Sequence, residues 1–151
     1  MSGIVGSESS RSGLVIRKMP AFYATRTGGN VGQNTVVVFD SESYDHTNNY
    51  NTSDGKFTAP FSGVYGFSCW MYTGSTGYFW LRINGTNVTY YNPWGGASNT
   101  NGTFVKQLRK GDYAQIYNGS AGDFRGTCLL YTSPSPRDQR GSGVPGWGGK
   151  K

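Results

Sequence analysis

Hydrophobic and polar residues alternate in short runs between residues 21 and 131, and the longest run is GVYGFSCWMY at residues 63–72. A period of two places successive side chains on opposite faces of a β-strand. One face of this run carries Tyr65, Phe67, Cys69 and Met71, and the other carries Gly66, Ser68, Trp70 and Tyr72. The first set is mainly apolar, which predicts a strand with one face in a core. The second set ends in two large aromatic residues, Trp70 and Tyr72, and we expect another part of the protein or a partner to cover them.

The other apolar runs have similar strand-like lengths and are separated by turn residues. They are AFYATR (21–26), NTVVVFDS (34–41), GKFTAP (55–60), YFWLRI (78–83), TNVTYY (86–91), TFVKQLRKGDYAQIY (103–117, two strands turning at Lys110–Asp112) and DFRGTCLLY (123–131). Residues 41–54 are polar and predict a loop, while Asn84–Gly85 predicts a two-residue hairpin because both residues tolerate positive φ. About nine short strands without a helix indicate an antiparallel sandwich or jelly roll.

Composition supports an all-β protein and indicates where the folded domain begins and ends. The sequence has 24 glycines, 15% aromatic residues and only 15% charged residues, which suits strands and turns. We expect a flexible polar segment at residues 1–19, one domain at 20–131 and a disordered tail at 132–151. The chain has no run of about 20 apolar residues that would span a membrane, and its start has no apolar secretory core.

Most of the net charge of +6 lies in the two ends of the sequence. Residues 1–19 and 128–151 together carry seven basic and two acidic residues, whereas residues 20–127 carry seven basic and six acidic residues, a balance of +1. A nucleic-acid-binding domain concentrates basic residues on its folded surface. The charge pattern therefore argues against nucleic acid as a partner.

One segment near the C-terminus resembles a sequence of artificial origin. CLLYTSPSPRD, residues 128–138, resembles the in-frame translation of a sequencing-library transposon adapter. On that interpretation the sequence stops recording the natural protein at about residue 127, and the remainder carries no functional information. A natural flexible linker is the alternative, and the DNA sequence across the codon for Thr127 distinguishes the two.

Candidate chemistry is sparse. His46 is the only histidine and no Gly-x-Ser-x-Gly motif accompanies it, so we expect a solvated loop histidine and no enzyme. Two cysteines without a second histidine do not make a zinc site. Asp40, Glu42 and Asp45 are weak calcium candidates, since carboxylate oxygens suit Ca²⁺ but the spacing matches no dedicated calcium loop. No cofactor is predicted.

The segment YYNPWGGASNTNGT, residues 90–103, is the best candidate for recognition. It combines aromatic residues with small polar ones, which suits contact with a glycan or a protein. The candidate contact residues are Tyr90, Tyr91, Trp94, Asn99 and Asn101. Alternatively, Trp94 only folds back over the end of the sheet.

YNTSDGKFTAPFSGVYGF, residues 50–67, resembles the signature of the C1q-like domain, and LRKGD (108–112) and FRGTCLL (124–130) resemble the family's hairpin and closing strand. The resemblance covers roughly residues 21–131. The residues that carry it as core and turn positions are Phe39, Phe57, Pro60, Gly63, Tyr65, Phe67, Leu108, Gly111, Asp112, Phe124 and Gly126. It implies a ten-stranded antiparallel jelly-roll sandwich of the C1q and tumour necrosis factor type.

The family resemblance also implies a homotrimer, in which Trp70 and Tyr72 are candidates for the subunit interface. The opening MSGIVGS further resembles the N-termini of short structural proteins of marine bacteriophages. Together these indicate a non-enzymatic recognition or structural module in a phage virion or tail fibre that contacts a host-cell protein or glycan. The alternative is an extracellular C1q-like protein of a cellular organism that binds a receptor or glycan. An enzyme is a third and weaker class.

Overall fold

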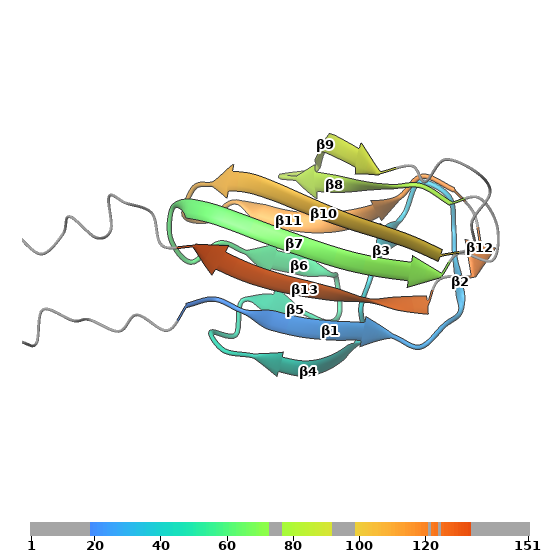
Figure 1. Ribbon diagram of the computed structural model, residues 1–151, viewed down its shortest axis with the longest axis horizontal. Coiled ribbons are helices and arrows are strands. Elements are labelled where there is room, and N and C mark those ends of the chain that lie inside the picture. Colours follow the sequence, from blue (N-terminus) through green and yellow to red (C-terminus); the bar gives the residue numbers. More distant parts are fainter. Residues whose placement is uncertain (1–18, 73–76, 92–98, 121, 124, 134–151) are drawn as a thin grey trace, which may run out of the picture.

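Two antiparallel sheets pack face to face in the computed structural model, which describes residues 19–72, 77–91, 99–120, 122–123 and 125–133 (Figure 1). The strands of this part of the chain are β1 (Phe22–Arg26), β2 (Asn30–Val31), β3 (Val36–Val37), β4 (Ser41–Asp45), β5 (Tyr50–Asn51), β6 (Lys56–Thr58), β7 (Gly63–Tyr72), β8 (Phe79–Ile83), β9 (Thr86–Tyr91), β10 (Asn99–Leu108), β11 (Tyr113–Asn118), β12 (Gly122–Asp123) and β13 (Arg125–Ser133). The predicted all-β jelly-roll sandwich is confirmed.

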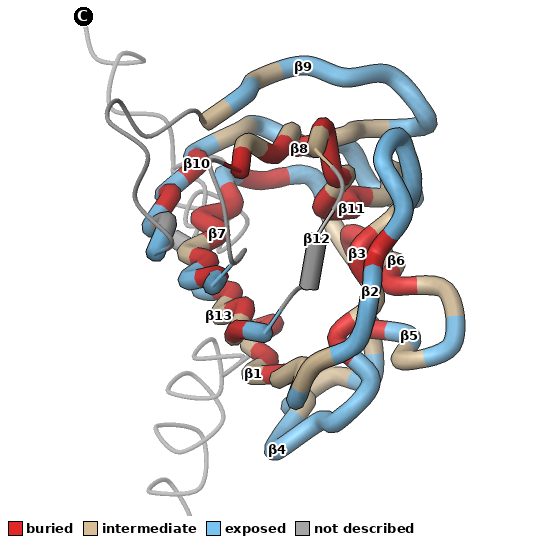
Figure 2. Tube along the Cα trace, turned by 90° about the vertical axis from the view of Figure 1, so that its right-hand side faces the viewer, coloured by how far each residue is buried: buried red, intermediate tan, exposed pale blue. Residues whose placement is uncertain are grey.

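The five-stranded sheet has the order β10-β7-β13-β1-β4. The second sheet has the order β5-β6-β11-β8-β9, with β3 also paired to β11, and we call it the six-stranded sheet. A small β12-β2 pair lies at one end of the sandwich (Figure 1). Figure 2 shows the buried residues of the two sheets facing each other across a common interior.

The predicted alternation of β7 is confirmed. Tyr65, Phe67, Cys69 and Met71 are at most 2% exposed, whereas Trp70 and Tyr72 are 41% and 37% exposed. Other core residues of the family signature, namely Phe39, Phe57 and Leu108, are also buried, and so are Gly63 and Gly126. Pro60 is half-buried between β6 and β7, and Phe124 lies outside the described residues.

Two strands interrupt the segment 41–54, so the prediction of one continuous loop there is wrong. β4 pairs with β1 at the edge of the five-stranded sheet, and β5 pairs with β6. Four of the five residues of β4 are exposed, and the fifth, Asp45, is only partly buried. An edge strand held by backbone pairing alone needs no apolar alternation, which is why its sequence, SESYD, does not read as a strand.

The hairpin predicted at Asn84–Gly85 joins β8 to β9. Both residues have positive φ, 49° and 81°, as a type I′ turn requires. A bulge between Leu81 and Arg82 shifts the register of this hairpin.

Asp112 connects this hairpin to the β10–β11 turn. One carboxylate oxygen accepts a hydrogen bond from the Asn84 side-chain amide at 2.8 Å, and the other accepts one from the Arg109 backbone N–H at 2.7 Å. These bonds, the Asn84 bond first, lower the pKa of the Asp112 carboxyl because both favour the charged form. Gly111, with φ of 89°, allows the turn. The turn predicted at Lys110–Asp112 is thus present between β10 and β11.

β13 lies between β7 and β1, so the segment that resembles an adapter forms a central strand of the five-stranded sheet. Cys128 and Leu130 are buried at 2% and 0% exposure. The strand continues to Ser133, and the Thr132 hydroxyl donates a hydrogen bond to the Pro20 carbonyl at 3.2 Å. The chain as it stands uses these residues to close its core, and their origin stays a prediction.

Gly126 on β13 is expected to tolerate no side chain. A Cβ atom there would overlap the Trp70 carbonyl oxygen and lie 2.9 Å from the Met71 Cα on β7. Gly126→Ala should therefore lower the free energy of unfolding by roughly 1–3 kcal/mol, because two central strands would have to separate. Gly32→Ala is the control, since its nearest neighbouring atom would be 3.5 Å away. Urea denaturation measures both, and equal midpoints for the two variants would contradict the packing.

Asp112→Asn should lower the melting temperature at pH 7, because it removes the charge that the two hydrogen bonds favour. The folded pKa lies below the unfolded value of about 3.9, so this stabilisation is present above that pH and is lost as the pH falls through the folded pKa. The difference from the unsubstituted chain should thus shrink in acid. Asp40→Asn, at an exposed position outside this cluster, is the control. A pH-independent difference would contradict the role of the Asp112 charge.

Candidate functional site

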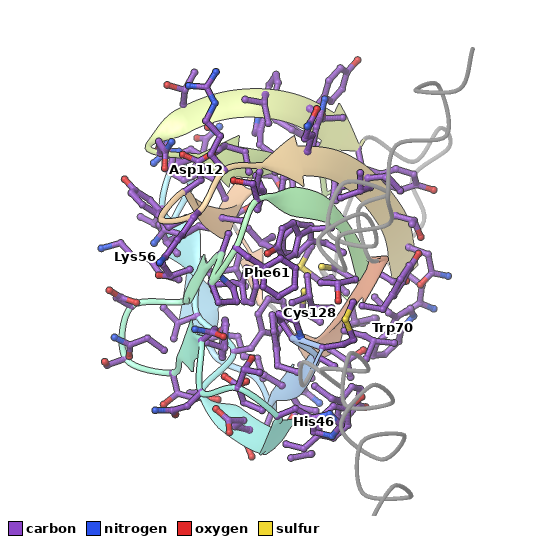
Figure 3. All side chains as sticks on the ribbon, turned by 90° about the vertical axis from the view of Figure 1, so that its left-hand side faces the viewer. His46, Lys56, Phe61, Trp70, Asp112 and Cys128 are labelled. Carbon is purple, nitrogen blue, oxygen red and sulfur yellow. The ribbon has the colours of Figure 1, made fainter. Side chains whose placement is uncertain are left out.

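Exposed apolar side chains gather on the outer face of the five-stranded sheet. Of the eight exposed large hydrophobic residues that the described part of the chain contains, six belong to this sheet: Tyr44, Val64, Trp70, Tyr72, Val105 and Tyr131. We call these six residues the apolar face. Figure 3 shows Trp70 on the outside of the sheet and Cys128 inside the sandwich. The two remaining residues, Val88 and Tyr90, lie on β9.

Strand register brings two residues of the apolar face to the same point on β7. Val105 on β10 and Tyr131 on β13 both pair with Gly66 on β7. The Tyr131 ring lies over Gly66, where an added Cβ atom would be 2.5 Å from the ring. The absence of a side chain at Gly66 therefore leaves room for the Tyr131 ring against β7.

The aromatic candidates of β7 join this face together with two residues predicted for the recognition loop. Asn101 pairs with Trp70, and Asn99 pairs with Tyr72, across β10 and β7. Both asparagines are exposed. The structure thus brings Asn99 and Asn101 to the apolar face.

The tyrosines predicted for the same loop lie in the other sheet. Tyr90 on β9 is 55% exposed, and its ring packs against that of Trp80 on β8 with centroids 4.9 Å apart. Tyr91 is half-buried and packs against Phe79 at 5.8 Å. Trp94 lies outside the described residues. The four candidates that the structure describes therefore lie in two different sheets.

Sequence reasoning missed Val64, Val105 and Tyr131 on the apolar face. Each one is next to a buried residue in its strand, so the alternation along β7, β10 and β13 could have identified the three. It also missed Trp80, Arg82 and Tyr117 of the six-stranded sheet. Trp80 and Arg82 are two residues apart in β8 and so share its outward face, which is a local signal, whereas Tyr117 joins them only through the pairing of β8 with β11.

The calcium candidates Asp40, Glu42 and Asp45 do not form a group that could hold a metal ion. The Asp45 carboxylate accepts backbone N–H bonds from Thr47 at 3.1 Å and from Asn49 and Tyr50 at 2.6 Å each, and so it orders the loop after β4. Among the described residues no group of three or more His, Cys, Asp or Glu side chains is suited to hold a metal. His46 is exposed, as predicted, with its ring 5.2 Å from that of Tyr44 (Figure 3).

The two cysteines are free thiols inside the sandwich, opposite each other on β7 and β13. Their sulfur atoms are 2.6 Å apart. Burial, together with the neighbouring Cys128, raises the pKa of the Cys69 thiol well above its usual range. A protonated, enclosed thiol is a poor nucleophile. Cys69 therefore packs as part of the core, as the alternation of β7 predicts.

Two comparisons with known proteins agree with this architecture. The C1q domain family model matches residues 21–128. The globular domain of zebrafish complement 1qA protein has a similar structure, with a TM-score of 0.68 and 19% identity over 76% of this chain and 98% of that one. Rabbit GITRL has a TM-score of 0.57 and 10% identity over 79% and 98% of the two chains. Eiger TNF from S. frugiperda has a TM-score of 0.55 and 11% identity over 80% and 98%.

At these identities the structural likeness shows the fold alone. No curated protein sequence matches the chain. Within the described residues there is no helix long and apolar enough to cross a membrane.

Proposed function

The chain belongs to the C1q domain family, and we propose that this non-enzymatic module is a homotrimeric recognition protein whose subunits meet at the apolar face. Trp70 and Tyr72 towards one end of β7, and Val105 and Tyr131 on either side of Gly66, form the contact. The other sheet and the loops at the ends of the sandwich stay open to a ligand.

The apolar face is the observation that carries this proposal. Six of the eight exposed large hydrophobic residues of the described chain lie there, and Val105 is 60% exposed. Contiguous apolar patches on a soluble protein mark interaction surfaces. Burial against a second copy would stabilise the assembly by about 25 cal/mol for each Å² of apolar area removed from water. In a closed ring of subunits every copy of the apolar face is covered, whereas an open chain of subunits leaves surfaces at its two ends exposed.

The ligand we propose is a protein or glycan on a cell surface. Our preferred setting is a phage virion or tail fibre that contacts its host, because residues 1–7 resemble the N-termini of phage structural proteins. The alternative is an extracellular protein of a cellular organism, which is favoured by the animal origin of the zebrafish, rabbit and S. frugiperda structures that share the fold. Capsid and tail genes beside this gene would support the first setting, and an upstream exon encoding a secretion signal would support the second.

The self-association predicts a mass in solution of three times 16.4 kDa. Val105→Glu should shift this mass to that of a single chain, because three carboxylates would be buried near one another in the interface. Val88→Glu is the matched control, since Val88 is also exposed, at 42%, but lies on β9. Sedimentation equilibrium of both variants measures the effect.

A single-chain mass for the unsubstituted protein would contradict the proposal. Equal dissociation of the two glutamate variants would also contradict it, since the effect would then not depend on the apolar face. Circular dichroism of each variant verifies that the sandwich remains folded.

A further inference from the structure

Three aromatic side chains form a row across the outer face of the six-stranded sheet. Trp80 on β8 pairs with Tyr90 on β9 and with Tyr117 on β11, so the three residues are direct neighbours on adjacent strands. Phe79, Leu81 and Ile116, the sequence neighbours of Trp80 and Tyr117, are buried, and Tyr90 is 55% exposed, which places the three side chains on the outward side. We call Tyr90, Trp80 and Tyr117 the aromatic row. Figure 2 shows β9, β8 and β11 at one side of the sandwich.

A cation is fixed beside this row. The Arg82 guanidinium carbon lies 3.4 Å from the centroid of the Tyr117 ring, and Arg82 Nε donates a hydrogen bond to the Asn87 Oδ1 at 2.9 Å. The stacking and the hydrogen bond together hold the planar group in one orientation. The Arg82 guanidinium is therefore already oriented in the absence of a ligand.

Arg82 forms no ion pair with a carboxylate of the described residues. Asp54 pairs with Lys56 at 3.2 Å, and Asp112 accepts its hydrogen bonds from Asn84 and Arg109. Asp45 is occupied by backbone N–H groups of its own loop. A guanidinium that is oriented but has no internal anion can receive a carboxylate from outside through two parallel hydrogen bonds.

We propose that the aromatic row and Arg82 bind an acidic oligosaccharide, with pyranose rings stacked on Trp80 and Tyr90 and a uronate carboxylate on Arg82. The C–H face of a pyranose ring is apolar and matches the face of an aromatic ring, while its hydroxyl groups remain at the rim. The Asn87 side chain, already oriented by Arg82, lies within the same strand pair and can bond those hydroxyl groups.

The size of the site favours a sugar over a protein. Three neighbouring strands span about 10 Å from the first to the last, which suits a few sugar rings. A stable protein interface buries about 800 Å² on each partner, far more than three rings and one guanidinium provide. The row also lies on the sheet opposite the apolar face, so it would remain open in the trimer.

This inference rests on the proposed recognition function and specifies its ligand class. Isothermal titration of the full chain should show binding of a hexasaccharide of alternating glucuronate and N-acetylglucosamine, or of an α-linked hexagalacturonate. Tyr90→Ala should weaken that binding about tenfold, the effect of losing one aromatic contact. His46→Ala is the matched control, because His46 carries an exposed ring outside both the aromatic row and the apolar face, and it should leave the affinity unchanged.

Arg82→Gln tests the charge separately from the stacking. It should weaken binding of the acidic hexasaccharide about tenfold and leave any binding of a neutral N-acetylglucosamine hexamer unchanged. Thermal melting of each variant verifies that it is folded. Failure of the unsubstituted chain to bind both acidic probes would overturn the proposal, and so would equal losses for Tyr90→Ala and His46→Ala or no loss for Arg82→Gln.

The mass of the unsubstituted chain, measured in the same buffer, keeps this test apart from that of the trimer. A trimer that binds neither acidic probe would refute the sugar site alone. A single chain that binds the acidic hexasaccharide would refute the trimer alone.

Discussion

The pairing of β7 with β10 on one side and β13 on the other is the constraint on which the rest of the structure depends. β7 is ten residues long and every one of those residues has a partner in β10. Because side chains alternate, this pairing places Phe67 and Met71 in the core and Trp70 and Tyr72 outside. A slip of one residue would exchange the two sets, burying Trp70 and exposing the core. The core and the apolar face are therefore two results of one register.

The two sheets present different chemistry to the outside. The five-stranded sheet carries exposed valine and aromatic side chains, which suit contact with a second copy of the chain. The six-stranded sheet carries aromatic rings mixed with a guanidinium and an amide, which suits a polar ligand with apolar patches. A trimer that uses the first surface leaves the second free. Self-association and recognition can thus be divided between the two faces of one sandwich.

Local sequence was sufficient where the physical cause is itself local. The Asn84–Gly85 hairpin follows from two residues that accept positive φ, and the turn at Gly111 and Asp112 follows from a glycine and a carboxylate that bonds nearby N–H groups. β4 was missed because an exposed edge strand carries no hydrophobic pattern. The recognition loop was predicted as one site, but Tyr90 and Asn101 lie in different sheets, and their separation depends on how strands far apart in sequence pair.

The sequence by itself determined the all-β class, the family and the inward face of β7, because period-two alternation and turn chemistry act over a few neighbouring residues. Only the tertiary structure decided which outward residues share a surface. Val105 and Tyr131 meet over Gly66, and Tyr117 meets Trp80, across strands that are 26 or more residues apart in the chain. These neighbours follow from strand order and register, which result from burying the whole core at once and are visible in no single segment.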